Sequence, residues 1–382
     1  MERVSLWLLG GILIENLFLD EEYNFFIKKS MVNLVMIILV LVIYLIILTI
    51  KIQIAFRLGL LLVVLYGLMI VRDFFVFIFL YEIVFILILF RLMFLGYRYE
   101  RLIASFLIIF YSFLFSRPVI IIIVIIDKVF LIKEWLLYNR FMRYFLVGSF
   151  LVKFPIFGFH YWLPVAHVEA STLGSILLAG VLLKLGCLGV IYVIQYLKFI
   201  VKFHWLVLGV LLTILIIVSL RDLKIIIAYS SVAHIRIVYY VLIIGDGLGI
   251  SGRVIIMFYH GFVSPVMFWL VGLLVWWKTR SLMVVKFMVF SVLCLYIIFL
   301  LVILNMSFPP IIGFLREIYI LKAIIKWWMI LGLISISILL TCFYNIYLFW
   351  GFSNIGGIIF KLRVSRVDVW VFLLLSWWFI YY

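Results

Sequence analysis

Long runs of apolar positions, separated by short connections that hold most of the charged residues, set the pattern of this chain. The run Met31–Ile50 contains no charged side chain at all. The hydrocarbon core of a bilayer is about 30 Å thick and takes roughly 20 apolar residues in a helix, whereas barrel strands alternate apolar and polar positions. The continuous runs therefore predict helices that span a membrane.

Successive windows of this pattern predict helices over 31–50, 56–72, 73–96, 103–126, 143–163, 171–197, 203–220, 225–245, 252–275, 286–306, 314–328, 330–351 and 367–381. A further apolar stretch covers 5–19. Residues 1–19 carry Glu2, Arg3 and Glu15 and have no small-residue cleavage site, so we expect neither a signal nor a transit peptide. The prediction is an all-α polytopic membrane protein with about 13 transmembrane helices.

Composition excludes a water-soluble protein. Hydrophobic residues make up 70% of the 382 residues and charged residues 12%, whereas soluble domains have about 45–50% and 25%. The net charge of +16 lies in short basic clusters between apolar runs. Loop charges of this kind orient helices and meet anionic lipid head groups, whereas a nucleic-acid-binding protein gathers them on one soluble face. We expect lipid partners and no nucleic acid.

Motifs for metals and redox cofactors are missing from the sequence. Cys187, Cys294 and Cys342 are scattered through apolar segments, as small buried hydrophobes are, and not as a disulfide, zinc or iron–sulfur framework. The sequence has neither a dinucleotide-binding glycine fingerprint nor a phosphate loop. His160 and His167 lie around a proline and are not spaced as a haem-ligating pair. The chain is expected to bind no cofactor or metal of its own.

Prolines interrupt two of the apolar segments. Pro155 lies in the stretch Phe154–Phe159, and Pro309 and Pro310 lie in the stretch Phe308–Phe314. Proline removes a backbone donor and breaks a helix, so both segments are predicted to be broken helices. Their common pattern of Phe-Pro, a short apolar gap and Gly-Phe suggests one structural unit used twice. Paired interrupted helices of this kind point to a transport site between two repeats.

Ionisable residues inside the spans are the candidate site: Glu82, Lys153, Lys184, His234, His260 and Glu317. A charged side chain at the centre of a membrane helix costs about 2.5–3.5 kcal/mol, so a chain that needed only to pack would use leucine. One Glu–Lys pair could serve merely to fix helix register, and a lone histidine could be satisfied by a neighbour. The whole set together favours a pathway for protons or ions.

Proton conduction requires groups that bind and release a proton near neutral pH. Burial favours the neutral forms of acids and amines, and an acid paired with a lysine acts as a switch when the two separate. Histidines and trapped water can carry protons between such groups. Around Lys184, small residues such as Gly180 and Gly186 allow helices to approach closely, which predicts a central place in the bundle.

The most specific motif is Lys153-Phe-Pro-Ile-Phe-Gly-Phe-His160-Tyr-Trp-Leu-Pro-Val-Ala-His167-Val-Glu169-Ala, which continues through Gly174-Ser175 to Leu182-Leu-Lys184-Leu-Gly186. With this motif the chain resembles the NADH dehydrogenase subunit 4 family, the antiporter-like membrane subunits of respiratory complex I. Further matching stretches are Tyr81-Glu82, Gly96–Arg101, Asp222–His234, His260–Phe262 and Asn305–Glu317. The resemblance covers roughly residues 70 to 350.

The resemblance implies two inverted five-helix repeats, each with a proline-broken helix. The domains would be N-terminal helices over 1–52, the first repeat over 53–200, the second over 201–351 and a C-terminal helix over 352–382. Fewer helices precede Glu82 than the family usually has. The absent ones would lie outside the channel or be replaced by partners.

The resemblance also implies roles for the candidate residues. Glu82 and Lys153 would form a modulating pair and Lys184 the central proton carrier, while the two histidines would lead towards Glu317 near the exit. Sister subunits 2 and 5 have a lysine in place of Glu317, so this acid indicates subunit 4.

Such a subunit belongs to a proton-translocating NADH:ubiquinone oxidoreductase, whose FMN, iron–sulfur clusters and ubiquinone are bound by other chains. The implied partners are subunits 2 and 5, supernumerary subunits and lipids including cardiolipin. The implied location is the mitochondrial inner membrane, with a bacterial plasma membrane as the alternative.

Arg236 and Pro265 depart from the family pattern. An Arg236 that faced the pathway would repel a proton on His234, whereas one that faced a partner or lipid head groups would be neutral. Two other functions remain open: a stand-alone or Mrp-type cation/proton antiporter, which would share the channel residues, and a scaffold that has lost pumping. Retention of the buried acids and lysines argues against the scaffold.

Overall fold

The apolar runs fold into helices, since a helix satisfies its backbone N–H and C=O groups internally. The computed structural model describes residues 33, 35–44, 47, 59–71, 74–95, 100–126, 140–156, 158–197, 206–244, 247–275, 288–289, 292–309, 311–325, 328–353 and 358–359. The predicted helix over 367–381 and the apolar stretch over 5–19 lie outside these residues.

Helices make up almost all of the described chain. A first helix spans Val35–Tyr44. The others are α4 (Gly59–Ile70), α5 (Phe74–Leu95), α6 (Glu100–Ile126), α8 (Arg140–Lys153), α9 (Trp162–Glu169), α10 (Thr172–Leu177), the π-helical turn η1 (Leu178–Leu182), α11 (Leu183–Leu197), α12 (Leu206–Ser219), α13 (Leu223–Ile244), α14 (Gly247–Val275), α16 (Val292–Met306), α17 (Ile312–Ile324) and α18 (Trp328–Ser353). Short strands β1 (Met288–Val289) and β2 (Ile358–Ile359) pair in parallel. The all-α class is confirmed for the described residues, with two corrections: the helix predicted over 286–306 begins at Val292, after β1, and the short helix α9 lies between two predicted spans.

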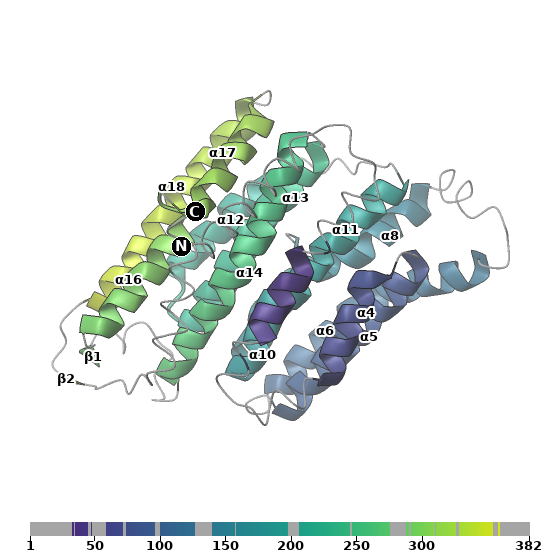
Figure 1. Ribbon diagram of the computed structural model, residues 1–382, viewed down its shortest axis with the longest axis horizontal. Helices are drawn as coiled ribbons and strands as arrows, with labels where there is room; N and C mark the ends of the chain where they lie inside the picture. Colours follow the sequence, from purple (N-terminus) through teal and green to yellow (C-terminus); the bar gives the residue numbers. More distant parts are fainter. Residues whose placement is uncertain are drawn as a thin grey trace, which may run out of the picture.

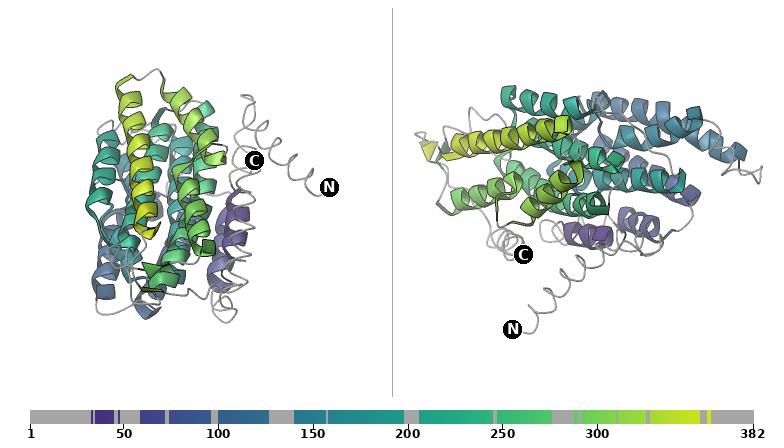
Figure 2. Two further views of the ribbon diagram at one scale, coloured as in Figure 1. Left: turned by 90° about the vertical axis from the view of Figure 1, so that its left-hand side faces the viewer. Right: turned by 90° about the horizontal axis from the view of Figure 1, so that it is seen from above.

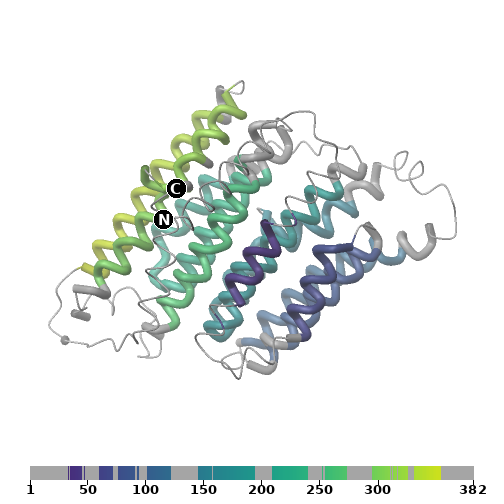
Figure 3. Tube along the Cα trace, viewed as in Figure 1, coloured from purple at the N-terminus to yellow at the C-terminus, as the bar shows by residue number. Residues whose placement is uncertain are grey.

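The helices stand side by side and lean in one direction (Figure 1). They run from α4–α6 at one end of the long axis, through α8–α14, to α16–α18 at the other. The Cα trace in Figure 3 shows the helix Val35–Tyr44, in purple, between α14 on one side and α4 on the other, in front of the helices that α10 begins. Viewed from the side and from above, this helix forms part of an outer layer over the central helices (Figure 2).

Burial separates central helices from peripheral ones. By length and composition, four described helices could cross a membrane, over Arg101–Ile121, Thr172–Val193, Val254–Gly272 and Leu331–Ser353. In the second and third, 100% and 89% of the residues are buried inside the bundle, whereas in the first and fourth the buried share is 28% and 33%. Apolar side chains that remain exposed suit helices in contact with lipid. The segments around Lys184 and His260 therefore form the centre, and the total number of spans stays a prediction.

Both predicted helix breaks are present. α8 ends at Lys153 and α9 begins at Trp162, while α16 ends at Met306 and α17 begins at Ile312. Pro118 and Pro265, in contrast, lie inside the continuous helices α6 and α14. A membrane helix tolerates proline where neighbouring helices stabilise it. The division into two inverted repeats, with the boundaries given above, stays a prediction.

Candidate proton pathway

An ion pair between Glu82 and Lys153 lies at the first break. The Lys153 ammonium donates a hydrogen bond to Oε1 of Glu82, and the two side chains are 1% and 17% exposed, lysine first. The ammonium also lies 4.5 Å from the ring centre of Tyr81 and 4.6 Å from that of Phe85. A carboxylate and two aromatic faces together compensate a cation that is removed from water. The structure thus brings the predicted pair into contact.

The end of α8 positions this lysine. Lys153 is the last residue of the helix, Phe154 still donates to the carbonyl of Phe150 at 2.8 Å, and Pro155 has no N–H to continue the ladder. Gly158 then adopts φ +100°, which a glycine reaches without steric cost. A helix C-terminus carries a partial negative charge that favours a nearby cation. The break therefore stabilises the ammonium and ends the helix at the same point.

Lys184 lies directly after the π-helical turn η1. Its side chain is 2% exposed, and its ammonium donates to the carbonyl of Ala179 within that turn. The turn is defined by a bond from the N–H of Leu183 to the carbonyl of Leu178, which spans one residue more than in an α-helix. Single π-turns occur frequently at functional sites. Nothing in the sequence pattern had indicated this turn.

Two glycines allow the helices of the ion pair and of His260 to pack closely around Lys184. A β-carbon on Gly186 would lie 3.4 Å from the hydroxyl of Tyr81 and 3.3 Å from the N atom of Phe154, which are the chain neighbours of the ion pair. A β-carbon on Gly261, the residue after His260, would lie 3.5 Å from Cε of Lys184. The central lysine therefore lies between the ion pair and the histidines.

His234 on α13 and His260 on α14 face each other. Their ring centres are 5.2 Å apart with the planes at 48°, and both side chains are buried. The backbone carbonyl of His260 accepts a hydrogen bond from Ser264 at 2.7 Å. Buried imidazoles at this separation can exchange a proton directly or through one water. The predicted histidine pair is therefore present as a structural unit.

Glu317 on α17 shares a cavity with His234. The lining residues are His234, Ile237, Ile256, Glu317, Ile320, Ile334, Ile338 and Thr341. The cavity leaves about 20 Å³ for the centre of a water molecule. One water needs roughly 10–15 Å³ by this measure and polar partners to hold it. The cavity can therefore connect the imidazole to the carboxylate through water.

Lys224 is a buried cation in the matching stretch Asp222–His234 and is not among the predicted site residues. Its side chain is 1% exposed, and its ammonium donates to the carbonyls of Ala170, at 3.0 Å, and Val168, at 3.3 Å. These carbonyls lie at the end of α9, where the chain turns into α10. Lys224 follows Asp222 at the start of its helix, so it had the pattern of a loop charge.

Further buried polar residues surround the same segment. His167 is fully buried and stacks on Phe268 with ring centres 4.3 Å apart and the planes at 5°. His160 lies with its ring centre 5.9 Å from that of Tyr229. Glu169 is also buried. Buried polar residues around α9 therefore include more side chains than the predicted site residues.

Arg236 points into the bundle. It is buried, and its Nη1 donates to the carbonyl of Gly209 on α12, which also accepts from the Thr213 hydroxyl at 3.0 Å. The alternative in which Arg236 faces lipid head groups or a partner is therefore wrong. Among the residues that the structure describes, no group of three or more His, Cys, Asp or Glu side chains could hold a metal ion.

A bundle with largely buried central helices and a line of buried and half-buried ionisable groups defines an integral membrane protein of the ion-translocating class. Residues 71–344 match the model of the "NADH:quinone oxidoreductase/Mrp antiporter, TM" family. The chain belongs to this family, and within it to the chain 4 subunits of NADH-ubiquinone oxidoreductase.

Relatives in this group come from several animals. The chain 4 protein of Ceratitis capitata is 33% identical over 300 residues, which cover 74% of this chain and 67% of the relative. The protein of Artemia franciscana is 35% identical over 281 residues, with 70% and 72% covered. The protein of Aedes aegypti is 36% identical over 279 residues, with 69% and 62% covered.

Solved structures share the fold. A chain of respiratory complex I from Thermus thermophilus matches with a TM-score of 0.73 at 19% identity, covering 91% of this chain and 79% of that one. A chain of the Mrp complex from Dietzia sp. matches with a TM-score of 0.68 at 16% identity, covering 78% and 60%.

Proposed function

We propose that this chain is the proton-translocating subunit 4 of the membrane arm of NADH:ubiquinone oxidoreductase. The observation that supports this most is the line of buried groups from the Glu82–Lys153 ion pair, past Lys184, to the histidine pair and Glu317. Lys153, Lys184 and both histidines are buried, while Glu82 and Glu317 are half-buried. Placing ionisable groups at such positions in a membrane bundle is costly, which favours a functional role for them.

The ion pair is the proposed switch. While Lys153 and Glu82 are in contact, each charge compensates the other and the lysine holds its proton. When a conformational change in the complex separates them, the ammonium loses its counter-charge in a medium of low polarity and releases its proton. The proton that leaves moves towards Lys184, whose contact with the Ala179 carbonyl stabilises the protonated amine.

From Lys184 the proton moves to the histidines. Gly261 allows the lysine stem to approach the helix that carries His260. The histidine pair then delivers the proton towards Glu317 through the shared cavity. The order of these transfers is part of the proposal.

Oxidation of NADH takes place elsewhere in the assembly in this proposal. FMN, iron–sulfur clusters and ubiquinone are assigned to other chains, and this chain converts a conformational change into proton movement. Its partners would be the antiporter-like subunits 2 and 5, supernumerary subunits and lipids including cardiolipin. The proposed location is the mitochondrial inner membrane.

An Mrp-type cation/proton antiporter is the second candidate, because the Dietzia Mrp chain has the same fold. Native electrophoresis of mildly solubilised membranes, with NADH-oxidation staining and mass spectrometry, separates the two functions. We expect the chain in the large NADH-oxidising band. Migration in a smaller particle without flavoprotein would contradict complex I membership and favour the antiporter.

Lys184→Ala tests the pathway in the assembled complex. We expect normal assembly, with proton pumping and the coupled reduction of quinone both lowered. Alanine at this position cannot carry a proton between the ion pair and the histidines. The matched control is Lys322→Ala, which removes an exposed lysine on α17. Normal pumping by an assembled Lys184→Ala complex would remove the central carrier from the mechanism.

A further inference from the structure

The helix Val35–Tyr44 presents one buried face to the centre of the bundle. Met36, Leu39, Val40 and Ile43 follow helical spacing and are all buried, whereas Leu41 is 55% exposed. In Figure 1 this helix lies over α10 and beside α14. α14 carries His260, and α10 continues through η1 into α11, which carries Lys184. The face of this helix that meets the pathway is therefore aliphatic.

A hydrogen-bonded residue holds the start of this helix in place. The Asn33 side chain donates to the carbonyl of Met69, at the end of α4, at 2.7 Å. Its Oδ1 accepts a hydrogen bond from the Tyr192 hydroxyl on α11, the helix that begins next to Lys184. These bonds fix the position of the helix along both neighbours.

Two glycines form notches that receive the leucine and isoleucine side chains. A β-carbon on Gly261 would lie 2.2 Å from Cδ1 of Leu39, so this methyl group occupies the space that the glycine leaves open. A β-carbon on Gly180 would lie 2.4 Å from Cδ1 of Ile43 and 2.9 Å from Cγ of Pro265. Since the Gly261 position is also 3.5 Å from Lys184 Cε, Leu39 lies next to the central lysine.

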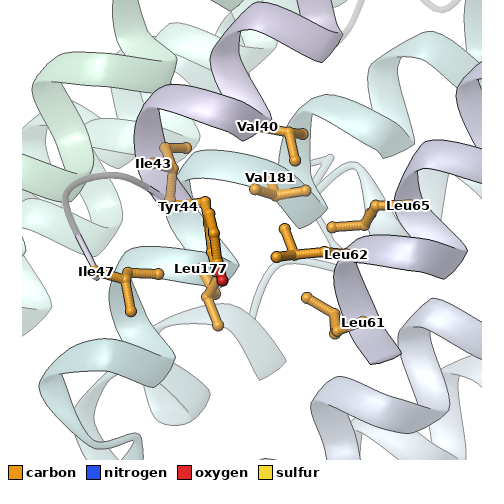
Figure 4. A pocket seen from close by; sticks show the side chains of 9 residues that line it. All are labelled: Val40, Ile43, Tyr44, Ile47, Leu61, Leu62, Leu65, Leu177 and Val181. Carbon is orange, nitrogen blue, oxygen red and sulfur yellow. The ribbon is translucent and has the colours of Figure 1, made fainter. Parts of the chain in front are cut away.

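The space behind the helix is apolar. A gap between this helix, α4 and the segment around η1 is lined by Val40, Ile43, Tyr44, Ile47, Leu61, Leu62, Leu65, Leu177 and Val181 (Figure 4). It leaves about 10 Å³ for the centre of a water molecule. Cavities without several polar partners stay dry even when they are larger. A proton on Lys184 therefore meets an aliphatic wall on this side.

We propose that the helix Val35–Tyr44 is a hydrophobic seal for Lys184, with Leu39 and Ile43 closing the notches at Gly261 and Gly180. This inference rests on the proposed function, since it assigns the seal to a proton-carrying lysine. An aliphatic barrier excludes water chains in the way that hydrophobic constrictions close channels by dewetting. The proton then leaves Lys184 only along the polar side of the bundle.

Leu39→Ala tests the seal, and Leu41→Ala on the exposed side of the same helix is the matched control. Purified complex in liposomes is measured for NADH oxidation, for protons pumped per NADH, and for decay of an imposed pH gradient without NADH. We expect Leu39→Ala to keep NADH oxidation, lower the pumped ratio by about twofold or more and speed the decay. The emptied notch adjoins Lys184, whose ammonium gives an entering water a charged partner that the space behind the helix lacks. Leu41→Ala should behave like the unaltered complex.

Leu39→Met should restore coupling because it refills the notch with a side chain of similar volume. An assembled Leu39→Ala complex that pumps normally and does not leak would overturn the seal. A parallel fall of NADH oxidation and pumping without leak would also overturn it and make Leu39 a positioning residue. Should Leu39→Ala fail to assemble, Leu39→Val is measured in the same way and decides by the same criteria.

The two proposals fail in different ways. Normal pumping by Lys184→Ala removes the carrier and with it the reason for a seal. Tight coupling in Leu39→Ala, together with lost pumping in Lys184→Ala, removes the seal alone.

Discussion

The two helix breaks share proline and phenylalanine in sequence but are stabilised by different chemistry. The first break carries charge: Lys153 ends α8 in contact with Glu82, and Lys224 donates to carbonyls at the far end of α9. At the second break, the described hydrogen bonds come from uncharged side chains. The Tyr259 hydroxyl donates to the carbonyl of Leu304 near the end of α16.

Amides complete the neutral framework of the second break. The Asn305 side chain donates to Asn345 Oδ1 at 2.8 Å and to the Tyr344 hydroxyl at 3.2 Å, and Asn345 donates to the carbonyl of Thr341 at 2.8 Å. Ser307 adopts φ +58°, an uncommon conformation for a residue other than glycine. Neutral hydrogen bonds and close packing thus contribute to this geometry.

The difference between the two breaks indicates which of them contains the ion pair that opens and closes during pumping. An ion pair in a medium of low polarity is costly to separate, so a break built on one resists opening until something compensates the charges. Neutral hydrogen bonds cost less to exchange. We infer that the first break carries the electrostatic switch, while the second keeps the helices of His260 and Glu317 in register.

The largest effect is expected for Glu82→Gln, which keeps the shape of the side chain and removes its charge. Lys153 would retain two aromatic neighbours but lose its carboxylate. Removing one partner of a buried ion pair costs about 3–5 kcal/mol. We expect pumping to fall by about tenfold or more, because Lys153 loses the charge that holds its proton until the pair separates; a tenfold fall corresponds to a transfer barrier raised by about 1.4 kcal/mol.

Proton uptake by liposomes that contain the Glu82→Gln complex measures this effect, together with the temperature at which the complex loses activity. Lys322→Gln, at an exposed position on α17, is the control. Unchanged pumping with Glu82→Gln would mean that the first break does not depend on its ion pair.

A smaller effect is expected for Lys224→Met, which keeps an unbranched chain without the ammonium. The carbonyls of Val168 and Ala170 would lose a charged donor. Hydrogen bonds to charged groups contribute about 1.5–3 kcal/mol. We expect earlier thermal inactivation and a partial loss of pumping, with NADH oxidation that responds in proportion. Stability equal to that of the unaltered complex would show that the end of α9 does not depend on the hydrogen bonds of Lys224.

Overpacking at Gly313 tests the neutral break. A β-carbon there would lie 2.8 Å from Oγ of Ser307 and 2.9 Å from Cζ of Tyr259, so Gly313→Ala must displace both side chains. Inserting a methyl group into a tight site costs about 1–3 kcal/mol. We expect Gly313→Ala to lower thermal stability, whereas Gly332→Ala, with nothing within 4 Å, should not. Equal stability of the two variants would contradict the tight packing of this break.

Much of this fold follows from local physics. Apolar run lengths predicted the long described helices but not the short α9, and the lack of an N–H on proline predicted both breaks, because these are properties of short segments. The contact between Glu82 and Lys153 was predicted through family resemblance. The π-turn before Lys184 and the seat of Leu39 against Gly261 depend on which helices become neighbours, so no local pattern indicated them.

The smallest effect is expected for Tyr259→Phe, which removes one neutral hydrogen bond from the second break. The Leu304 carbonyl would still accept from the backbone N–H of Ser307 at 3.1 Å, so it would not be left without a donor. A neutral hydrogen bond contributes about 1 kcal/mol. We expect a slight fall in thermal stability and pumping within about twofold of the unaltered complex, because His260 keeps its helix and its facing ring. If Tyr259→Phe instead abolished pumping as Glu82→Gln is expected to, the two breaks would be equally critical, and the division into an electrostatic switch and a neutral support would be wrong.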